Sequence, residues 1–138
     1  MFFNKKKEIK SENTYLIKVA SLLVHAAKID ENYSDIEEEI IKKTLIELGA
    51  NQNDVDTLMI KAKQNEEKAN QILDFTREIK KLDEKDKIQI IKSLWRIIYS
   101  NKDADIYETN LMRRLSGLLY IDSKTMGDIK EQIKKENS

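Results

Sequence analysis

The chain has 138 residues and a formal net charge of zero; 36% of its residues are charged and 40% are hydrophobic. It has no cysteine, which excludes disulfides and thiolate metal sites, and no apolar run approaches the ~20 residues needed to cross a bilayer. The balanced charge provides no general attraction for nucleic acid, so we expect the protein to bind none. The length is typical of one domain. Without a secretory signal or a membrane-spanning run, we expect the protein to be cytoplasmic. With no proline and three glycines, the composition favours an all-α fold.

Residues 1–12 are predicted to be a flexible lead-in, and residues 13–135 to form the helical domain. The lead-in places Phe2 and Phe3 beside three lysines, a composition that can also touch a membrane surface. Stable anchoring usually needs two such signals, so the flexible interpretation is favoured. The start of the chain also lacks the apolar segment of a secretory signal.

The first predicted helix covers residues 13–29, and its inward face repeats at helical spacing. That face consists of Leu16, Val19, Ala20, Leu23, Ala26 and Ala27. His25, the only histidine, falls on the outer face. It is a poor candidate for catalysis, because no serine or cysteine nucleophile pattern accompanies it.

A second helix is predicted to begin within the acidic stretch at residues 30–39. Ser34 and Glu37 have the S-x-x-E spacing of a capping box, in which each side chain bonds the other residue's backbone N–H. Gly49 is predicted to end this helix at the C′ position. The buried face is predicted to be Ile36, Ile40, Thr44 and Leu48.

The third and fourth helices are separated by a polar segment. Asn51 or Asn53 is predicted to cap the third helix, since asparagine is favoured at that position. The polar run at residues 64–70 is predicted to be a break, and a fourth helix is predicted around residues 72–79.

Three more helices complete an expected bundle of about seven. Asp83 is predicted to cap the fifth helix. Asp105 is predicted to cap the sixth, with Glu108 as the second member of a D-x-x-E capping box. Asp122 or Ser123 is predicted to cap the last.

An internal repeat relates the two halves of the chain. A shift of 71 residues places Val24 on Trp95 and Glu37 on Glu108, so that each copy reads as helix, acidic turn and capped helix. Two copies predict a pseudo-two-fold bundle, because a solenoid needs about three stacked repeats. We expect Leu23 and Trp95 both to lie in the core.

The two acidic turns are the only candidates for chemistry. In Asp30-x-Asn32-x-Ser34 and Asn101-x-Asp103-x-Asp105 the side-chain oxygens have the alternating spacing that hard cations accept, so Asp30, Asn32 and Asp103 are candidate ligands for Ca²⁺ or Mg²⁺. Neither turn is an EF-hand loop, because the glycine at position six and the glutamate at position twelve are absent. Helix capping explains part of the same acidity, so both interpretations stay open.

At these turns the chain resembles the tellurite-resistance TerB family and the wider set of TerB-like domains, which includes the N-terminal region of membrane-anchored DnaJ-like co-chaperones. The stretch from Asp30 to Glu37 is similar to the family's A-D-G-x-x-x-x-E turn, with one more residue between the two acids, and Glu108 stands where Glu37 stands in the second copy. The runs L-W-R at residues 94–96 and L-M-R-R-L at residues 111–115 are similar to the family's other motifs. The resemblance covers nearly the whole chain.

The resemblance implies a seven-helix bundle, acidic residues that bind a divalent cation, and a role in tellurite or stress resistance through protein complexes near the membrane. Glu31 and Lys102 stand where the family has a turn glycine, and Asn101 stands where the second turn has an aspartate. These departures weaken the case for a cation that bridges both turns. The remaining expectation is a weaker cation site centred on Asp30 and Glu37.

The leading functional hypothesis is a non-enzymatic helical module that binds unidentified, including membrane-associated, protein partners and responds to a divalent cation. A metal-assisted hydrolase is the first alternative, but the acidic turns have no nearby histidine ligand, phosphate-binding glycine loop or general acid. The second alternative is a regulatory domain without a ligand.

Overall fold

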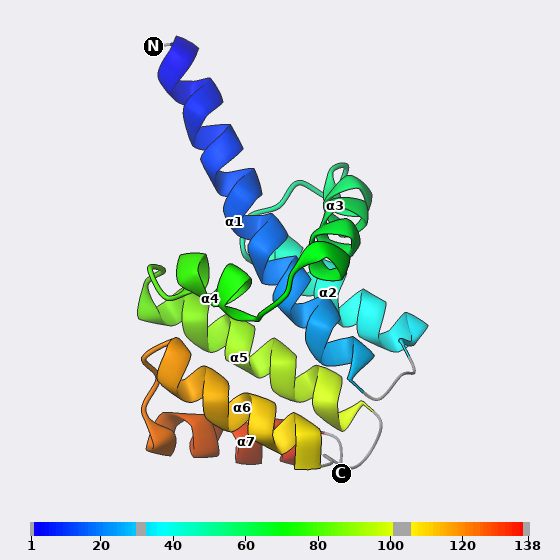
Figure 1. The fold of residues 1–138 in the computed structure, drawn as a ribbon, viewed down its shortest axis with the longest axis vertical. Helices are drawn as coiled ribbons and strands as arrows, with labels where there is room; N and C mark the ends of the chain where they lie inside the picture. Colours follow the sequence, from blue (N-terminus) through cyan, green and yellow to red (C-terminus); the bar gives the residue numbers. More distant parts are fainter. Residues whose placement is uncertain (1, 30–32, 101–105, 137–138) are drawn as a thin grey trace.

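The computed structural model describes residues 2–29, 33–100 and 106–136, and within these ranges it contains helices and no strands (Figure 1). The helices are α1 (Phe2–Lys28), α2 (Asp35–Glu47), α3 (Val55–Lys68), α4 (Leu73–Ile79), α5 (Glu84–Tyr99), α6 (Ile106–Leu118) and α7 (Ser123–Glu136). The described residues therefore confirm the all-α, seven-helix prediction.

The first helix is longer than the sequence suggested. It begins at Phe2, whereas the predicted helix began at residue 13, and its N-terminal turns extend past the other helices in Figure 1. The predicted flexibility of residues 1–12 and the domain limits of 13 and 135 stay predictions. The C-terminal half of α1 lies at the centre of the bundle, where it packs against α2, α3, α4 and α5.

Three predicted helix starts are confirmed by side-chain hydrogen bonds. The Ser34 capping box is complete at the start of α2. Asp83 accepts a hydrogen bond from a backbone N–H in the first turn of α5 (2.9 Å), and Asp122 accepts one in the first turn of α7 (2.7 Å). Each bond satisfies an amide that has no partner within its own helix.

The predictions around α3 were wrong in two respects. The residue before the helix is Asp54, and it makes no side-chain capping bond. Asn51 instead accepts a hydrogen bond from the N–H of Asn53 (3.0 Å), which stabilises a turn before the helix. The expected break at residues 64–70 comes later, because α3 continues to Lys68.

The ends of α2 and α6 are built alike. Gly49 follows α2 with φ of +112°, and Tyr120 follows α6 with φ of +58°. In both places the next residue's N–H donates to the carbonyl five residues earlier (2.9 Å), which is the Schellman arrangement. Gly49 and Tyr120 are 71 residues apart, which is the offset of the predicted repeat. Superposition of the two halves stays a prediction.

The core is one continuous cluster to which all seven helices contribute. Leu23 from α1 and Trp95 from α5 are both buried in it, as the sequence predicted. In Figure 1, α5 lies between α1 on one side and the pair α6 and α7 on the other. The side chains buried on α1 and α5 therefore hold the two halves of the domain together.

Candidate functional site

The first acidic turn leads into a buried helix start. Glu37 is 1% exposed, and its Oε1 accepts hydrogen bonds from the N–H and the Oγ–H of Ser34 (2.9 Å each). Ser34 Oγ in turn accepts a bond from the Glu37 N–H (3.2 Å). This geometry confirms the capping role of Glu37. The other predicted ligands of this turn, Asp30 and Asn32, lie outside the described residues.

The second acidic turn also leads into a helix whose first turn buries a glutamate. Glu108 lies in the first turn of α6 and is 4% exposed, so it is buried like Glu37. Asp103 and Asp105 lie outside the described residues. Among the residues that are described, no group of three or more acidic, histidine or cysteine side chains is placed to hold a metal ion. The predicted cation site is therefore still a prediction.

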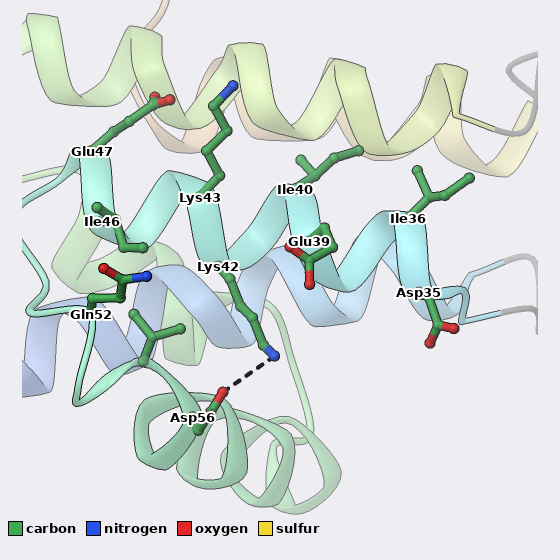
Figure 2. Close-up of a pocket in the computed structure, with 11 residues that line it drawn as sticks. Asp35, Ile36, Glu39, Ile40, Lys42, Lys43, Ile46, Glu47, Gln52 and Asp56 are labelled. Carbon is green, nitrogen blue, oxygen red and sulfur yellow. Dashed lines mark ion pairs between the residues drawn. The ribbon is translucent and has the colours of Figure 1, made fainter.

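A groove of about 910 Å³ lies between α2 and the start of α3. Its lining includes Ile36, Ile40, Ile46, Gln52, Val55 and Asp56. Ile36 is 64% exposed and Ile46 is 42% exposed, and Figure 2 shows both on the surface of α2. Two large aliphatic side chains on one short helix are thus left in contact with solvent.

This exposure corrects the predicted face of α2. The sequence pattern placed Ile36, Ile40, Thr44 and Leu48 inside. Thr44 is buried as predicted, and Ile40 and Leu48 are partly buried against the core, but Ile36 is exposed. The other buried residues of α2 are Glu37, Ile41 and Leu45. The buried stripe is displaced by about one residue from the predicted one, with Glu37 on the inner face. Ile36, the neighbour of Glu37, is then turned outward.

Two ion pairs join α2 to α3, and the first of them lies in the groove. Lys42 Nζ lies 3.2 Å from Asp56 Oδ1, as Figure 2 shows, and Lys63 Nζ lies 2.6 Å from Glu38 Oε1. The hydrogen bond from Lys63 lowers the pKa of Glu38 below its ordinary value. Lys63 also lies 5.1 Å from the ring centre of Tyr33, whose pKa is raised by burial and by Glu38.

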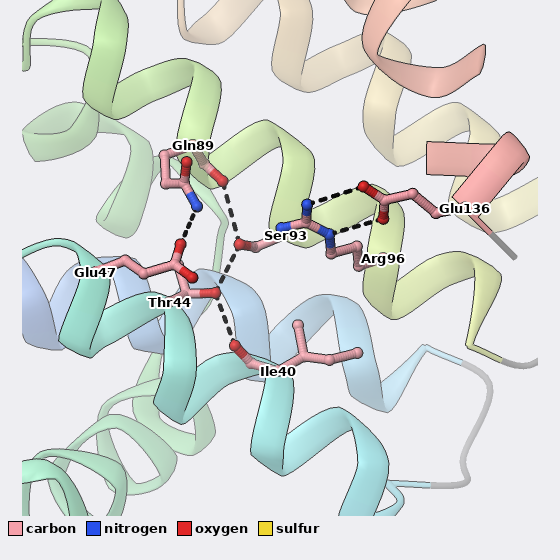
Figure 3. Close-up of polar contacts among 7 residues, drawn as sticks. All are labelled: Ile40, Thr44, Glu47, Gln89, Ser93, Arg96 and Glu136. Carbon is pink, nitrogen blue, oxygen red and sulfur yellow. Dashed lines mark hydrogen bonds and ion pairs between the residues drawn. The ribbon is translucent and has the colours of Figure 1, made fainter. Parts of the chain in front are cut away.

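The other side of α2 is held by α5. The hydroxyl groups of Thr44 and Ser93 are 2.6 Å apart in the core, and Gln89 donates a hydrogen bond to Glu47 (Figure 3). The hydroxyl pair satisfies two buried polar groups at once, so it is stable where water is excluded. Because α2 is bonded to both α3 and α5, its outer face is held in one orientation.

The single histidine lies at an edge of the bundle. Its ring Nδ1 is 3.3 Å from Glu66 Oε1, and Lys28 Nζ is 2.8 Å from the other oxygen of the same carboxylate. Glu66 and His25 line a small pocket of about 190 Å³ together with Arg114. The charges in this pocket compensate one another, and His25 lies at an edge, as predicted.

The fold defines the class of the protein: an all-helical domain in which two helices that follow acidic turns each bury a glutamate in their first turn. The chain matches the family model of the tellurite resistance protein TerB over residues 16–131, and it belongs to that family. No curated protein and no solved structure matches the chain. Within residues 2–29, 33–100 and 106–136, no helix is long and apolar enough to cross a bilayer.

Proposed function

We propose that this TerB-family domain is a non-enzymatic protein-interaction module whose docking surface is the groove between α2 and α3. The observation that carries the proposal is the exposure of Ile36 and Ile46 beside the groove. Exposed aliphatic side chains bordered by charged ones are typical of surfaces that bind another protein. The length of α2 suits an amphipathic helix laid along the groove.

Site-directed photo-crosslinking in the native cell tests this proposal. A benzophenone amino acid at Ile36 is expected to give protein adducts. The matched control is the same amino acid at Tyr120, which is 71% exposed but lies at the end of α6, away from the groove. Equal adduct yields at the two positions, or none at Ile36, would contradict the proposed docking surface.

We also propose that the first acidic turn binds Ca²⁺ or Mg²⁺ more strongly than the second does. The support is the similarity of Asp30 and Glu37 to the family's acidic positions, whereas Asn101 and Lys102 depart from them. Millimolar Ca²⁺ should raise the thermal midpoint, because a ligand of the folded state stabilises it. Asp30→Asn should abolish that rise, while Asp103→Asn should leave most of it. Equal effects of the two variants would overturn this ranking.

The cellular setting is part of the same proposal. The family's description as a tellurite resistance protein supports a role in stress resistance, and the cysteine-free composition suits a cytoplasmic domain. We infer that the complexes it forms include membrane-associated proteins. A panel of phosphatase and esterase substrates tests the hydrolase alternative: turnover that Asp30→Asn abolishes would replace the interaction role with an enzymatic one.

A further inference from the structure

The outer face of α2 carries a regular pattern of four residues. Ile36, Glu39, Lys43 and Ile46 are all exposed and are spaced three, four and three residues apart. At 3.6 residues per turn, these positions fall within about 80° of the helix circumference. They form one stripe with an isoleucine at each end and two opposite charges in the middle. We call these four residues the α2 stripe.

The α2 stripe is complementary to a reversed copy of itself. Its two isoleucines lie five residues on either side of Ile41, and its two charged residues lie two residues on either side. If a second α2 packs its exposed face antiparallel against the first, with the two-fold axis at the height of Ile41 along the helix, Ile36 faces Ile46 of the second copy. Glu39 then faces Lys43 of the second copy, and each contact occurs twice because a two-fold interface repeats it.

The same charges disfavour the parallel alternative. Parallel packing in register would place Glu39 against Glu39 and Lys43 against Lys43, and like charges that face one another repel. Two of the neighbouring charges are already engaged within the chain, since Lys42 pairs with Asp56 and Glu47 accepts a hydrogen bond from Gln89. The charged residues that face outward on the α2 stripe therefore select the antiparallel arrangement.

We propose that the partner which the docking surface binds is a second copy of this chain, joined through antiparallel packing of the α2 stripe. This inference rests on the proposed function, because it names the occupant of the same surface. Ile60 of α3 is also exposed, and it lies near the side of α3 that carries Asp56 and Lys63, both paired with α2. Each protomer thus adds a third isoleucine beside the stripe.

The expected dimer is weak and reversible. Two helices of 13 residues with a flanking side chain bury less than the ~1,200 Å² that is typical of stable complexes. The monomer–dimer equilibrium should therefore depend on protein concentration within the micromolar range that transient interfaces occupy. Sedimentation velocity across a concentration series measures it directly.

Charge reversal tests the register. Lys43→Glu and Glu39→Lys should each raise the dimer dissociation constant by about tenfold, because every substitution acts at two symmetry-related pairs. The double variant, Glu39→Lys with Lys43→Glu, should restore dimerisation, since it exchanges the two charges. Far-UV circular dichroism of each variant controls for folding. Failure of the double variant to recover dimerisation would overturn the antiparallel pairing.

Cysteine crosslinking provides a second test. The chain has no cysteine of its own, so only the introduced cysteines can form disulfides. A mixture of Ile36→Cys and Ile46→Cys should form a mixed disulfide dimer under mild oxidation. Each variant alone should crosslink far less, because residues ten positions apart on a helix are separated by about 15 Å. Equal crosslinking of the separate variants would contradict the two-fold arrangement.

The two proposals fail in different ways. A chain that stays monomeric at all concentrations, but gives adducts with a different protein at Ile36, refutes self-association and leaves the docking surface supported. A monomer that gives no adducts at Ile36 refutes both. A dimer that Lys43→Glu leaves intact refutes the α2 stripe as the contact between copies.

Discussion

The side chain of Trp95 provides the sharpest test of the core. It is 4% exposed, stacks on Tyr99 at a ring-centre distance of 5.9 Å, and has Lys130 Nζ at 5.5 Å from its ring centre. Its indole N–H has no hydrogen-bond partner among the described residues. A large buried ring that also carries an unsatisfied donor has two opposing effects on stability, and two substitutions separate them.

Trp95→Ala should destabilise the domain by about 3–5 kcal/mol. An aromatic side chain buries roughly 200 Å², which at about 25 cal/mol per Å² is close to 5 kcal/mol. The usual cost of emptying an aromatic core site is about 3–5 kcal/mol. Since small domains are stable by only about 5–15 kcal/mol, this variant could be partly unfolded at room temperature.

Trp95→Phe should change the free energy of unfolding by less than about 1 kcal/mol. The smaller ring and the weaker contact with Lys130 each cost roughly 1 kcal/mol. Removing a buried N–H without a partner returns about 1–3 kcal/mol, the penalty for leaving such a donor unsatisfied. The two contributions nearly cancel.

Urea unfolding followed by far-UV circular dichroism measures both variants, since the substitutions remove the only tryptophan and with it the fluorescence signal. A Trp95→Phe cost as large as about 3 kcal/mol would show that the indole N–H is bonded after all. A Trp95→Ala cost below about 1 kcal/mol would refute its place in the core.

Three further predictions concern helix ends and one ion pair. Tyr120→Gly should stabilise the domain by roughly 0.5–1 kcal/mol in thermal unfolding, because glycine adopts positive φ without strain. Gly49→Ala should destabilise the domain by about 1 kcal/mol for the same reason. If both substitutions stabilised or both destabilised the domain, the positive φ at these two helix ends would be contradicted. Ser34→Ala should cost about 1 kcal/mol in urea unfolding, and a neutral result would mean that the buried cap is dispensable. The pKa of Glu38 is lowered from its ordinary 4.5 by Lys63, so the stability from this pair is present above pH 4.5 and is lost as the pH falls through the folded-state pKa. Glu38→Gln should therefore lose less stability than the wild type between about pH 5 and pH 3, and parallel pH profiles would show that the pair contributes nothing.

The helices could be predicted because residues at their own starts and ends determine where they begin and end. A capping box, an aspartate before a helix and a glycine after one each act within a few residues, so Ser34, Asp83, Asp122 and Gly49 carry their own signals. Tyr120 has no such signal, because tyrosine is not a residue that favours positive φ. Its cap becomes visible only in the folded backbone.

The orientation of α2 could not be predicted, because two apolar stripes overlap in its sequence. One contains Ile36 and Ile40, and the other contains Ile41 and Leu45; packing against α3 and α5 decides between them. Hydrophobicity alone argues against burying Glu37, and its hydrogen bonds to Ser34 offset part of the cost of that burial. The groove, which depends on this choice, was therefore missed.

The burial of Glu37 at the start of α2 affects how readily the first turn of this helix opens. The first turn of a helix usually frays, but here fraying would pull the Glu37 carboxylate out of a site that is 1% exposed. The amide of Glu37 should therefore exchange its hydrogen only through large openings, unlike the amides at most helix starts. Ile36 is held in this slowly exchanging segment, so a partner that contacts it loses little conformational entropy of this chain on binding.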